Sequence, residues 1–521
     1  MTSRITPPKA QLRLVEALLD PARYPHQVQR VECIETHISW VLLAGDYAYK
    51  VKKGVDLGFL DFTTLSLRRH FCQEELRLNR RLAPRLYLDV WSIGGSPEAP
   101  LWQEEPAIEY AVRMRRFPPE ARLDHVLERG ELQPHHLTLF ADRMARFHDR
   151  ADRPPPASPW GGEDVVWQAI EENFAPIAEA PGERGERLAA LEERVGRLFE
   201  RQRERIRRRR QGRIRCCHGD LHLQNLVLLE GEVVPFDGIE FNPAFYWIDP
   251  INDIAFLFMD LNVRGEPALA WVFLNGWLTA SGDYEGLPLL PLYATYRALV
   301  RAKVSAIRLV QAAAERETRE AVERYLGEAQ RLLAPPPPIL VLMHGLSGSG
   351  KSVVAGHLTP QLEAVWLRSD VERKRLHPQQ QGRYAPETSD RVFDHLRKIA
   401  RLALESGFNV VVDATFLERK RRKPFLQLAG ELDIPLVILH VEAPPEVLRR
   451  RVTERARCAT DPSEADLRVL EQQLAGRGDP LDEEERGLAL SLDTENTSPE
   501  ELAKEALAAC RTFRLLSVEY T

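Results

Sequence analysis

The chain has 521 residues and a formal net charge of −6; 44% of its residues are hydrophobic and 28% are charged. This length and composition exclude a disordered or fibrous chain and predict two or three domains, and neither half is basic enough for a nucleic-acid-binding arm. The six cysteines form no CxxC pair or metal-ligand cluster and no apolar run approaches the ~20 residues of a membrane span, so we expect a cytoplasmic protein with reduced thiols and no membrane contact.

The first chemical signature is a predicted strand over residues 47–52, with the sequence Tyr-Ala-Tyr-Lys-Val-Lys. Its alternation matches the V-A-I-K strand of kinases, whose lysine holds the nucleotide phosphates, so Lys50 is the predicted ATP-binding lysine. A helix predicted over residues 70–82 offers Glu74 and Glu75 as ion-pair partners for this lysine. The leucines at 76, 78 and 82 favour Glu75. An inter-lobe strand is predicted downstream, over residues 109–114.

The catalytic signature is His-Gly-Asp-Leu-His-Leu-Gln-Asn at residues 218–225, which precedes a predicted strand at 226–229. Asp220 and Asn225 stand five residues apart, as in the kinase loop H-R-D-x-x-x-x-N. In that arrangement the aspartate acts on the acceptor hydroxyl and the asparagine binds a metal ion. Asp237 follows twelve residues after Asn225, where kinase folds place a metal-binding aspartate. We therefore predict Asp220 as the general base and the other two residues as Mg²⁺ ligands.

The order Y-A-Y-K, then H-G-D-L-H-x-x-N, then D-x-x-E resembles the aminoglycoside phosphotransferase and choline kinase branch of the protein-kinase-like fold. The resemblance covers about residues 25–320 and implies a bilobal α+β domain that binds ATP and Mg²⁺. It also implies that Lys50 contacts the α- and β-phosphates. Asp249 and Asp253 resemble the acids that brace the catalytic loop in this branch, with helix capping as the alternative. The chain departs from the branch at residues 35–39, where Thr36 and Ser39 stand in place of a glycine-rich loop.

A basic run separates these signatures, with nine arginines and one acid between Arg201 and Arg215. One interpretation is a binding footprint for nucleic acid or another polyanion. The other is a solvated helix that leads to the catalytic loop, and the absence of interleaved aromatic residues favours it.

The domain boundary is predicted at the prolines of residues 335–338, a stiff spacer that ends the helix predicted over 318–333. Residues 339–343 form a continuous apolar run, which is typical of a strand buried on both faces of a parallel sheet. The sequence therefore predicts a kinase-like domain at 1–334, a proline linker at 335–338 and a second, α/β domain at 339–521.

The second domain opens with Gly-Leu-Ser-Gly-Ser-Gly-Lys-Ser at residues 345–352, which fits G-x-x-x-x-G-K-[ST] between a predicted strand and a predicted helix. In such a P-loop the backbone N–H groups cradle phosphate, the lysine bridges the β- and γ-phosphates, and the serine binds Mg²⁺. The predicted ATP-binding residues are Gly345, Ser347, Gly348, Ser349, Gly350, Lys351 and Ser352; Lys351 is also a predicted catalytic residue and Ser352 a metal ligand.

Three later features complete the predicted P-loop site. A strand at 364–367 ends just before Asp370, a base candidate, and a strand at 409–412 ends at Asp413, which is placed to order Mg²⁺. After another strand at 437–441, the helix that carries Arg449 to Arg451 and Arg455 has the guanidinium density of a phosphate-clamping lid, with Arg450 as the predicted ligand. A solvated helix is the alternative. A closing helix is predicted over residues 499–510.

Residues 339–510 resemble the P-loop kinases of small molecules and polynucleotides, a group that includes phage-type polynucleotide 5′-kinase and the zeta toxins. The resemblance implies a parallel sheet with helices on both faces, Asp370 as general base, and an arginine lid. As a whole, the chain resembles bacterial fusions of a phosphotransferase-like domain with a P-loop ATP-binding domain.

The sequence thus predicts a kinase with two Mg·ATP sites, each transferring a γ-phosphoryl group to a hydroxyl of a small-molecule acceptor. Two alternatives stay open. In one, the P-loop domain phosphorylates a polynucleotide 5′-hydroxyl; in the other, one domain senses nucleotide and regulates the other domain.

Overall fold

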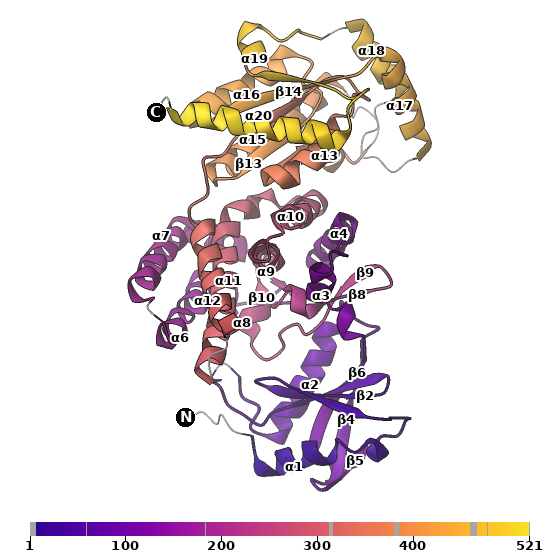
Figure 1. The fold of residues 1–521 in the computed structure, drawn as a ribbon, viewed down its shortest axis with the longest axis vertical. Helices are drawn as coiled ribbons and strands as arrows, with labels where there is room; N and C mark the ends of the chain where they lie inside the picture. The colour runs from indigo at the N-terminus through magenta and orange to yellow at the C-terminus, as the bar shows by residue number, and fades with distance from the viewer. Residues whose placement is uncertain are drawn as a thin grey trace. The chain divides into compact units, whose positions relative to one another are not determined.

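The computed structural model describes residues 7–58, 60–182, 184–311, 316–379, 385–458, 466–476 and 478–519 (Figure 1). The chain divides into two compact units, residues 1–175 with 199–260, and residues 176–198 with 261–521. The prolines at 335–338 lie inside the second unit, so the predicted division into domains at 1–334 and 339–521 stays a prediction. Within the described ranges, no helix combines the length and the apolar character that crossing a bilayer would need.

After helix α1 (Lys9–Ala17), the first unit forms a six-stranded antiparallel sheet in the order β1-β2-β3-β6-β4-β5. Helix α2 (Leu65–Asn79) packs against this sheet through buried Cys72, which lies in one apolar cluster with Tyr87 and Val112. The predicted strand at 47–52 and the inter-lobe strand are confirmed. The helix predicted over 70–82 forms over Leu65–Asn79, so it both begins and ends earlier than expected, and Thr64 caps its start by accepting a hydrogen bond from the Leu67 N–H. The strands are β1 (Val31–Glu35), β2 (Ser39–Ala44), β3 (Tyr47–Lys52), β4 (Tyr87–Ser96), β5 (Ala99–Trp102) and β6 (Glu109–Arg115).

The rest of the first unit is mainly helical and carries the predicted catalytic loop. That loop lies between β7 (Arg215–Cys216), which pairs with β10 (Trp247–Ile248), and β8 (Leu226–Leu229), which pairs with β9 (Glu232–Pro235). Its helices include α3 (Leu123–Glu128), α4 (Pro134–Arg150), α5 (Glu163–Glu171), α8 (Pro243–Tyr246) and the start of α9 (Pro250–Val263). The two strand pairs thus hold both ends of the catalytic loop.

Residues 201–210 of the basic run lie in the last turns of helix α7 (Gly185–Arg210), as the helical interpretation predicted, and Arg213 and Arg215 follow the helix. The basic run is not simply solvated. Arg209 is buried and its guanidinium donates to both oxygens of Asp249, at 2.6 and 2.8 Å. Arg207 pairs with Glu163 and Glu204. These guanidinium groups already have carboxylate partners, which disfavours a continuous polyanion-binding surface.

The second unit contains a five-stranded parallel sheet in the order β12-β13-β11-β14-β15, which confirms the predicted P-loop fold class. The strands are β11 (Leu340–His344), β12 (Ala364–Arg368), β13 (Asn409–Asp413), β14 (Leu436–Glu442) and β15 (Ala489–Asp493). Strands β11, β13 and β14 are mainly continuous runs of Val, Leu and Ile, which is typical of strands that are covered by helices on both faces. Helices α13 (Lys351–Leu362) and α20 (Pro499–Glu519) share the core of one face, and α15 (Pro386–Glu405) packs against β13.

Several elements of this unit were not predicted. They are β15, α16 (Arg419–Leu432), α18 (Leu467–Gly476) and α19 (Glu483–Gly487), and α20 extends well past the predicted end at residue 510. Short helix α14 (Ser369–Leu376) begins directly after β12, so Asp370 lies in its first turn.

The edge strand β12 is covered from upstream in the chain. Asn275 lies on α10 (Pro267–Ser281), which belongs to the same unit together with α11 (Leu290–Gln311) and α12 (Arg316–Leu332). Its side-chain amide donates to the Ala364 carbonyl and accepts from the Trp366 N–H, both at 2.9 Å. The amide therefore takes the place of a peptide group from a neighbouring strand.

Candidate active sites

The predicted lysine–glutamate ion pair forms in the first unit. Lys50 Nζ donates to Glu75 Oε1 at 2.9 Å, and both side chains are buried. Glu74 points elsewhere and pairs with Arg77. Although burial lowers the pKa of Lys50, the nearby carboxylates of Asp237, Glu75 and Glu240 raise it well above its usual value. Lys50 is thus a fixed ammonium at the place expected for phosphate binding.

A second lysine, not predicted, shares the same carboxylate. Lys52 Nζ donates to Glu75 Oε2 at 2.7 Å and also to Glu240, and it is completely buried. Burial raises the pKa of Glu75, but the two ammonium groups outweigh it and hold this pKa at about 2. Strand alternation could have shown that Lys50 and Lys52 share a face, and D-x-x-E supplied Glu240.

The predicted base Asp220 lies at the tip of the catalytic loop, with its side chain 30% exposed. Its Oδ2 accepts from Asn225 Nδ2 at 2.7 Å, and His222 Nε2 lies 3.3 Å from the same oxygen. The loop geometry thus brings the two signature residues together. An exposed carboxylate edge leaves Asp220 accessible to an acceptor hydroxyl.

The catalytic loop is braced as the resemblance implied. Both oxygens of Asp253 accept loop N–H groups, from His218 at 3.1 Å and from Gly219 at 2.8 Å, while His148 Nε2 lies 3.0 Å from one of them. Burial lowers the pKa of His218. Because Nδ1 accepts from the Asp220 N–H, the ring proton is on Nε2, which donates to the Phe236 carbonyl. His218 thereby ties the loop to the segment that precedes Asp237.

The predicted metal ligands offer oxygen donors beside Lys50. Asp237 Oδ1 lies 2.5 Å from Lys50 Nζ, and the Asp237 side chain is 44% exposed. Asn225 uses Nδ2 to donate to Asp220, and its Oδ1 accepts no hydrogen bond from the described residues. A carboxylate and an amide carbonyl are ligands that Mg²⁺ takes. This donor set suits Mg²⁺, and its assignment as the metal site stays a prediction.

The loop between β1 and β2 stands where a glycine-rich nucleotide loop was expected to be replaced. Of its two hydroxyl residues, Thr36 and Ser39, the hydroxyl of Thr36 is already hydrogen-bonded within the turn. The Thr36 hydroxyl donates to the Ser39 carbonyl and accepts from the Ser39 N–H, each at 3.0 Å. This hydroxyl closes the turn, and it would have to leave that bond to contact phosphate.

The P-loop joins β11 to α13 through backbone conformations that glycine adopts. Gly345, Gly348 and Gly350 have φ values of +142°, +82° and +93°, and a Cβ at Gly345 would lie 2.2 Å from the Val441 carbonyl oxygen. Lys351 Nζ donates to the Leu346 carbonyl at 2.7 Å, and Gln473 of α18 accepts from the Ser347 N–H at 2.9 Å. The loop has the wrapped shape that the motif predicts, with two of its polar groups bonded inside the protein.

Two carboxylates gather where the parallel strands end. Register pairs Arg368 with Asp413 and Asp413 with Met343, so β12, β13 and β11 end side by side next to the P-loop. Burial raises the pKa of Asp413, against the opposing effects of Arg368, a hydrogen bond from Ser352, and Lys351. Asp370 lies in the first turn of α14, just beyond this edge, and its charge opposes the fall in the pKa of Lys351. Lys351, Ser352, Asp413 and Asp370 therefore gather at one edge of the sheet.

The arginine helix α17 (Pro445–Cys458) divides its guanidinium groups among different environments. Arg449 pairs with Glu471, while Arg451 donates to the hydroxyl and carbonyl of Thr494, whose hydroxyl donates to Ser349 O at 2.8 Å. Arg450, the predicted phosphate ligand, is exposed. Of the three consecutive arginines, it is the one without a partner among the described residues.

Burial lowers the pKa of Lys351 to about 8, against the opposing charges of Asp413 and Asp370. Phosphate favours the ammonium form, so above about pH 8 ATP binding at this loop should take up a proton, and affinity should fall by up to about tenfold per pH unit. Calorimetry at about pH 9 in two buffers of different ionisation enthalpy measures this uptake. Lys351→Arg, whose side chain does not titrate there, is the control; equal uptake by both proteins would contradict the prediction.

Comparisons with known proteins give one match to the P-loop part alone and another to most of the chain. A family model described as an AAA domain matches residues 340–480. The uncharacterized protein Rv2004c of Mycobacterium tuberculosis is 31% identical over 443 residues, which cover 82% of this chain and 86% of the relative.

Solved structures also match parts of the chain. One is amicoumacin kinase hAmiN in complex with AMP-PNP, Ca²⁺ and Ami, with a TM-score of 0.41 and 13% identity, covering 63% of this chain and 93% of that one. Another is a gluconokinase from Sinorhizobium meliloti, with a TM-score of 0.27 and 24% identity, covering 36% of this chain and 100% of that one. Both of these proteins are kinases by name.

Proposed function

Because this chain belongs to the same family as the Mycobacterium tuberculosis protein Rv2004c and covers 86% of its length, we propose one function for the whole chain rather than for either part alone. It is an ATP- and Mg²⁺-dependent phosphotransferase with two separate nucleotide sites. One site lies within residues 1–334 and the other within 339–521. Each transfers the γ-phosphoryl group to the hydroxyl of an acceptor.

The observation that carries the proposal is the joined set of charges in the first unit. Lys50 bridges Glu75 and Asp237, and Asp220 and Asn225 share a hydrogen bond on the catalytic loop. Phosphoryl transfer needs little covalent chemistry from the protein and depends on positioning and charge stabilisation. The set offers an ammonium for phosphate, oxygen donors for a cation, and a carboxylate for the acceptor proton.

In the reaction we propose, Lys50 orients the α- and β-phosphates and Asp220 accepts the proton of the attacking hydroxyl. The acceptor oxygen forms a bond to the γ-phosphorus as the bond to the β-phosphate oxygen breaks, and ADP leaves. Mg²⁺, when bound, neutralises charge on the phosphates. Asp237 and Asn225 would hold it there.

At the P-loop we propose that Lys351 and the backbone of residues 345–352 bind the phosphates. Ser352 and Asp413 would hold Mg²⁺, Arg450 would close on the nucleotide, and Asp370 would act as base. The gathering of Lys351, Ser352, Asp413 and Asp370 at one sheet edge supports their assignment. Arg450 is exposed and has no partner among the described residues, which leaves its guanidinium available to a nucleotide.

A small-molecule acceptor is the class we propose, in the cytoplasm. Arg207 and Arg209 of the basic run are committed to carboxylates, which argues against a polynucleotide track. The buried thiols Cys72, Cys216, Cys217 and Cys510 are free, in keeping with a reducing compartment.

A phosphorylation screen tests the function. Labelled ATP is incubated with the full chain and with sugars, small amines, nucleosides and 5′-hydroxyl oligonucleotides, in parallel with Asp220→Asn and Asp370→Asn. We expect label on a small hydroxyl compound that depends on one of these two aspartates. Label on the oligonucleotide alone would favour the polynucleotide alternative, and no label on any acceptor despite ATP binding would favour a regulatory role.

A further inference from the structure

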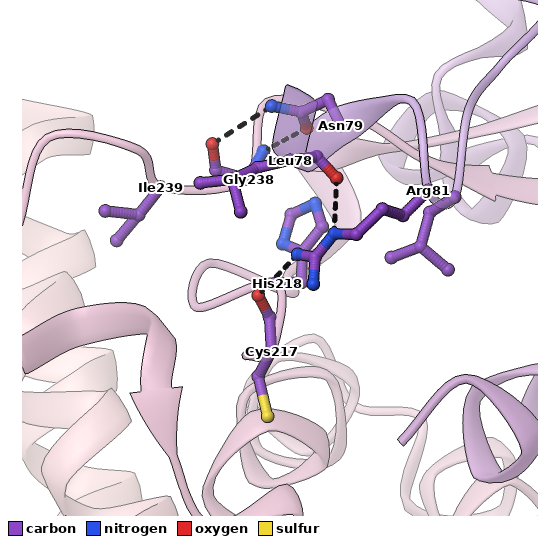
Figure 2. A pocket seen from close by; sticks show the side chains of 8 residues that line it. Leu78, Asn79, Arg81, Cys217, His218, Gly238 and Ile239 are labelled. Atoms are coloured by element: carbon purple, nitrogen blue, oxygen red, sulfur yellow. Dashed lines mark hydrogen bonds between the residues drawn. The ribbon is translucent and has the colours of Figure 1, made fainter. Parts of the chain in front are cut away.

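Helix α2 ends against the loops that carry the proposed metal ligand and base (Figure 2). Its last residue, Asn79, is 3% exposed. Asn79 Oδ1 accepts from the Gly238 N–H at 2.8 Å, and Nδ2 donates to the carbonyl oxygens of Gly238 at 3.3 Å and Glu75 at 3.0 Å. One amide thus binds both polar groups of the residue next to Asp237 and the backbone of the glutamate that pairs with Lys50.

The segment that Asn79 holds needs such support. Asp237 has a φ of +58°, in the left-handed region where a non-glycine residue costs about 1 kcal/mol or more. Its N–H donates to the hydroxyl of buried Tyr87 at 2.9 Å. On the next residue, a Cβ added to Gly238 would lie 3.0 Å from the His218 carbonyl oxygen. The backbone at 237–238 is therefore pressed between α2, β4 and the catalytic loop, and hydrogen bonds fix it there.

The same end of α2 also holds the catalytic loop. Arg81 donates through Nη1 to the Cys216 carbonyl at 2.7 Å. Its Nη2 donates to the Cys217 carbonyl at 3.2 Å and its Nε to the Leu78 carbonyl at 2.8 Å (Figure 2). The two cysteine carbonyl groups lie immediately before His218. The C-terminal end of α2 and the turn that follows it are thus hydrogen-bonded to the metal segment through Asn79 and to the start of the catalytic loop through Arg81.

We propose that Asn79 is a positioning residue that sets Asp237 for Mg²⁺, by holding the Gly238 peptide group to the helix that carries Glu75. The proposal rests on the proposed function of this site. It implies that the ion-pair glutamate and the metal aspartate are placed by one shared contact. The helix does not move away without displacing the metal segment, so the site is assembled before nucleotide binds.

The test uses Asn79→Asp in the full chain, in a Lys351→Ala background that silences the P-loop site. Aspartate has the same shape and still accepts from the Gly238 N–H, but it loses both donated bonds and faces two carbonyl oxygens. We expect the Mg²⁺ concentration for half-maximal ATP binding, and Mn²⁺ affinity by electron paramagnetic resonance, to worsen about 10- to 100-fold, as for lost support of a metal ligand. ATP binding in EDTA should be unchanged.

The matched control is Asn173→Asp. Asn173 is also fully buried at a helix end and donates to two backbone carbonyl groups, of Ala169 and Ile170, but it touches neither loop. It should lower the melting temperature without changing the Mg²⁺ requirement. Tyr87→Phe, which removes the acceptor for the Asp237 N–H, is a milder second variant and should shift the Mg²⁺ requirement in the same direction.

Equal Mg²⁺ requirements for Tyr87→Phe, Asn79→Asp and the control would overturn the positioning role while leaving the proposed function intact. If the Lys351→Ala parent itself shows no Mg²⁺-dependent ATP binding, the proposed function of the first site fails, and this inference fails with it.

Discussion

Replacing Asp220 with asparagine should cut phosphoryl transfer at the first site by about 10²- to 10⁴-fold, the usual contribution of a positioned base. ATP affinity should be nearly unchanged, because the Asp220 carboxylate contacts Asn225 and His222 rather than Lys50. The Asp220 side chain is 30% exposed, so an acceptor hydroxyl can reach it. Turnover with the acceptor found in the screen, together with calorimetric titration of Mg·ATP, separates these two effects.

Asp370→Asn is the matched control, because it makes the same carboxylate-to-amide change at the start of α14 in the other site. If Asp220 serves the first site, only one of the two variants should lose transfer to a given acceptor. Wild-type turnover by the Asp220 variant on every acceptor would identify the first domain as a binding module.

Replacing Lys351 with alanine should remove one of two ATP sites. Lys351 is buried in the P-loop and is the loop's own cation, so its loss should weaken nucleotide binding there by ~2 kcal/mol or more, about 30-fold. Calorimetry should show the stoichiometry fall from two ATP per chain toward one at ordinary ATP concentrations.

Lys50→Ala is the complementary variant and should remove the other site. Circular dichroism and melting temperature are needed for both, because each lysine is buried and bonded: Lys351 to the Leu346 carbonyl, and Lys50 to Glu75 and Asp237. Two sites of unchanged affinity in a folded Lys351 variant would contradict the P-loop assignment.

Local patterns in the sequence were enough to locate the residues that form the framework of both candidate sites. The alternation of 47–52 and the leucine spacing after Glu75 selected the correct ion pair, because strand and helix periodicity decide which way these side chains point. The P-loop was equally legible, since its glycines, lysine and serine act within eight consecutive residues between a strand and a helix.

The supporting contacts could not be predicted in this way. Glu240 reaches Lys52 across 188 positions, and Gln473 reaches Ser347 across 126. Asn79 is an ordinary polar residue at a helix end until the fold brings Gly238 to it. Each of these contacts depends on tertiary packing, which the local periodicity of the sequence does not predict. Strand β15 was missed for a related reason, because its half-exposed edge position lacks the continuous apolar run of its neighbours.

The amide of Asn275 on the border of β12 has a consequence for how such proteins can be cut or recombined. A gene shortened to begin at the prolines would encode the P-loop motif intact, yet its product would leave the Ala364 and Trp366 peptide groups open on a bare strand. Exposed edge strands of two molecules can pair through these open backbone groups, so we expect the fragment to self-associate. A chimera whose upstream half came from an unrelated kinase should self-associate in the same way, unless that half also supplied a side chain that bonds the edge of β12. The two halves are therefore expected to be exchanged together rather than separately.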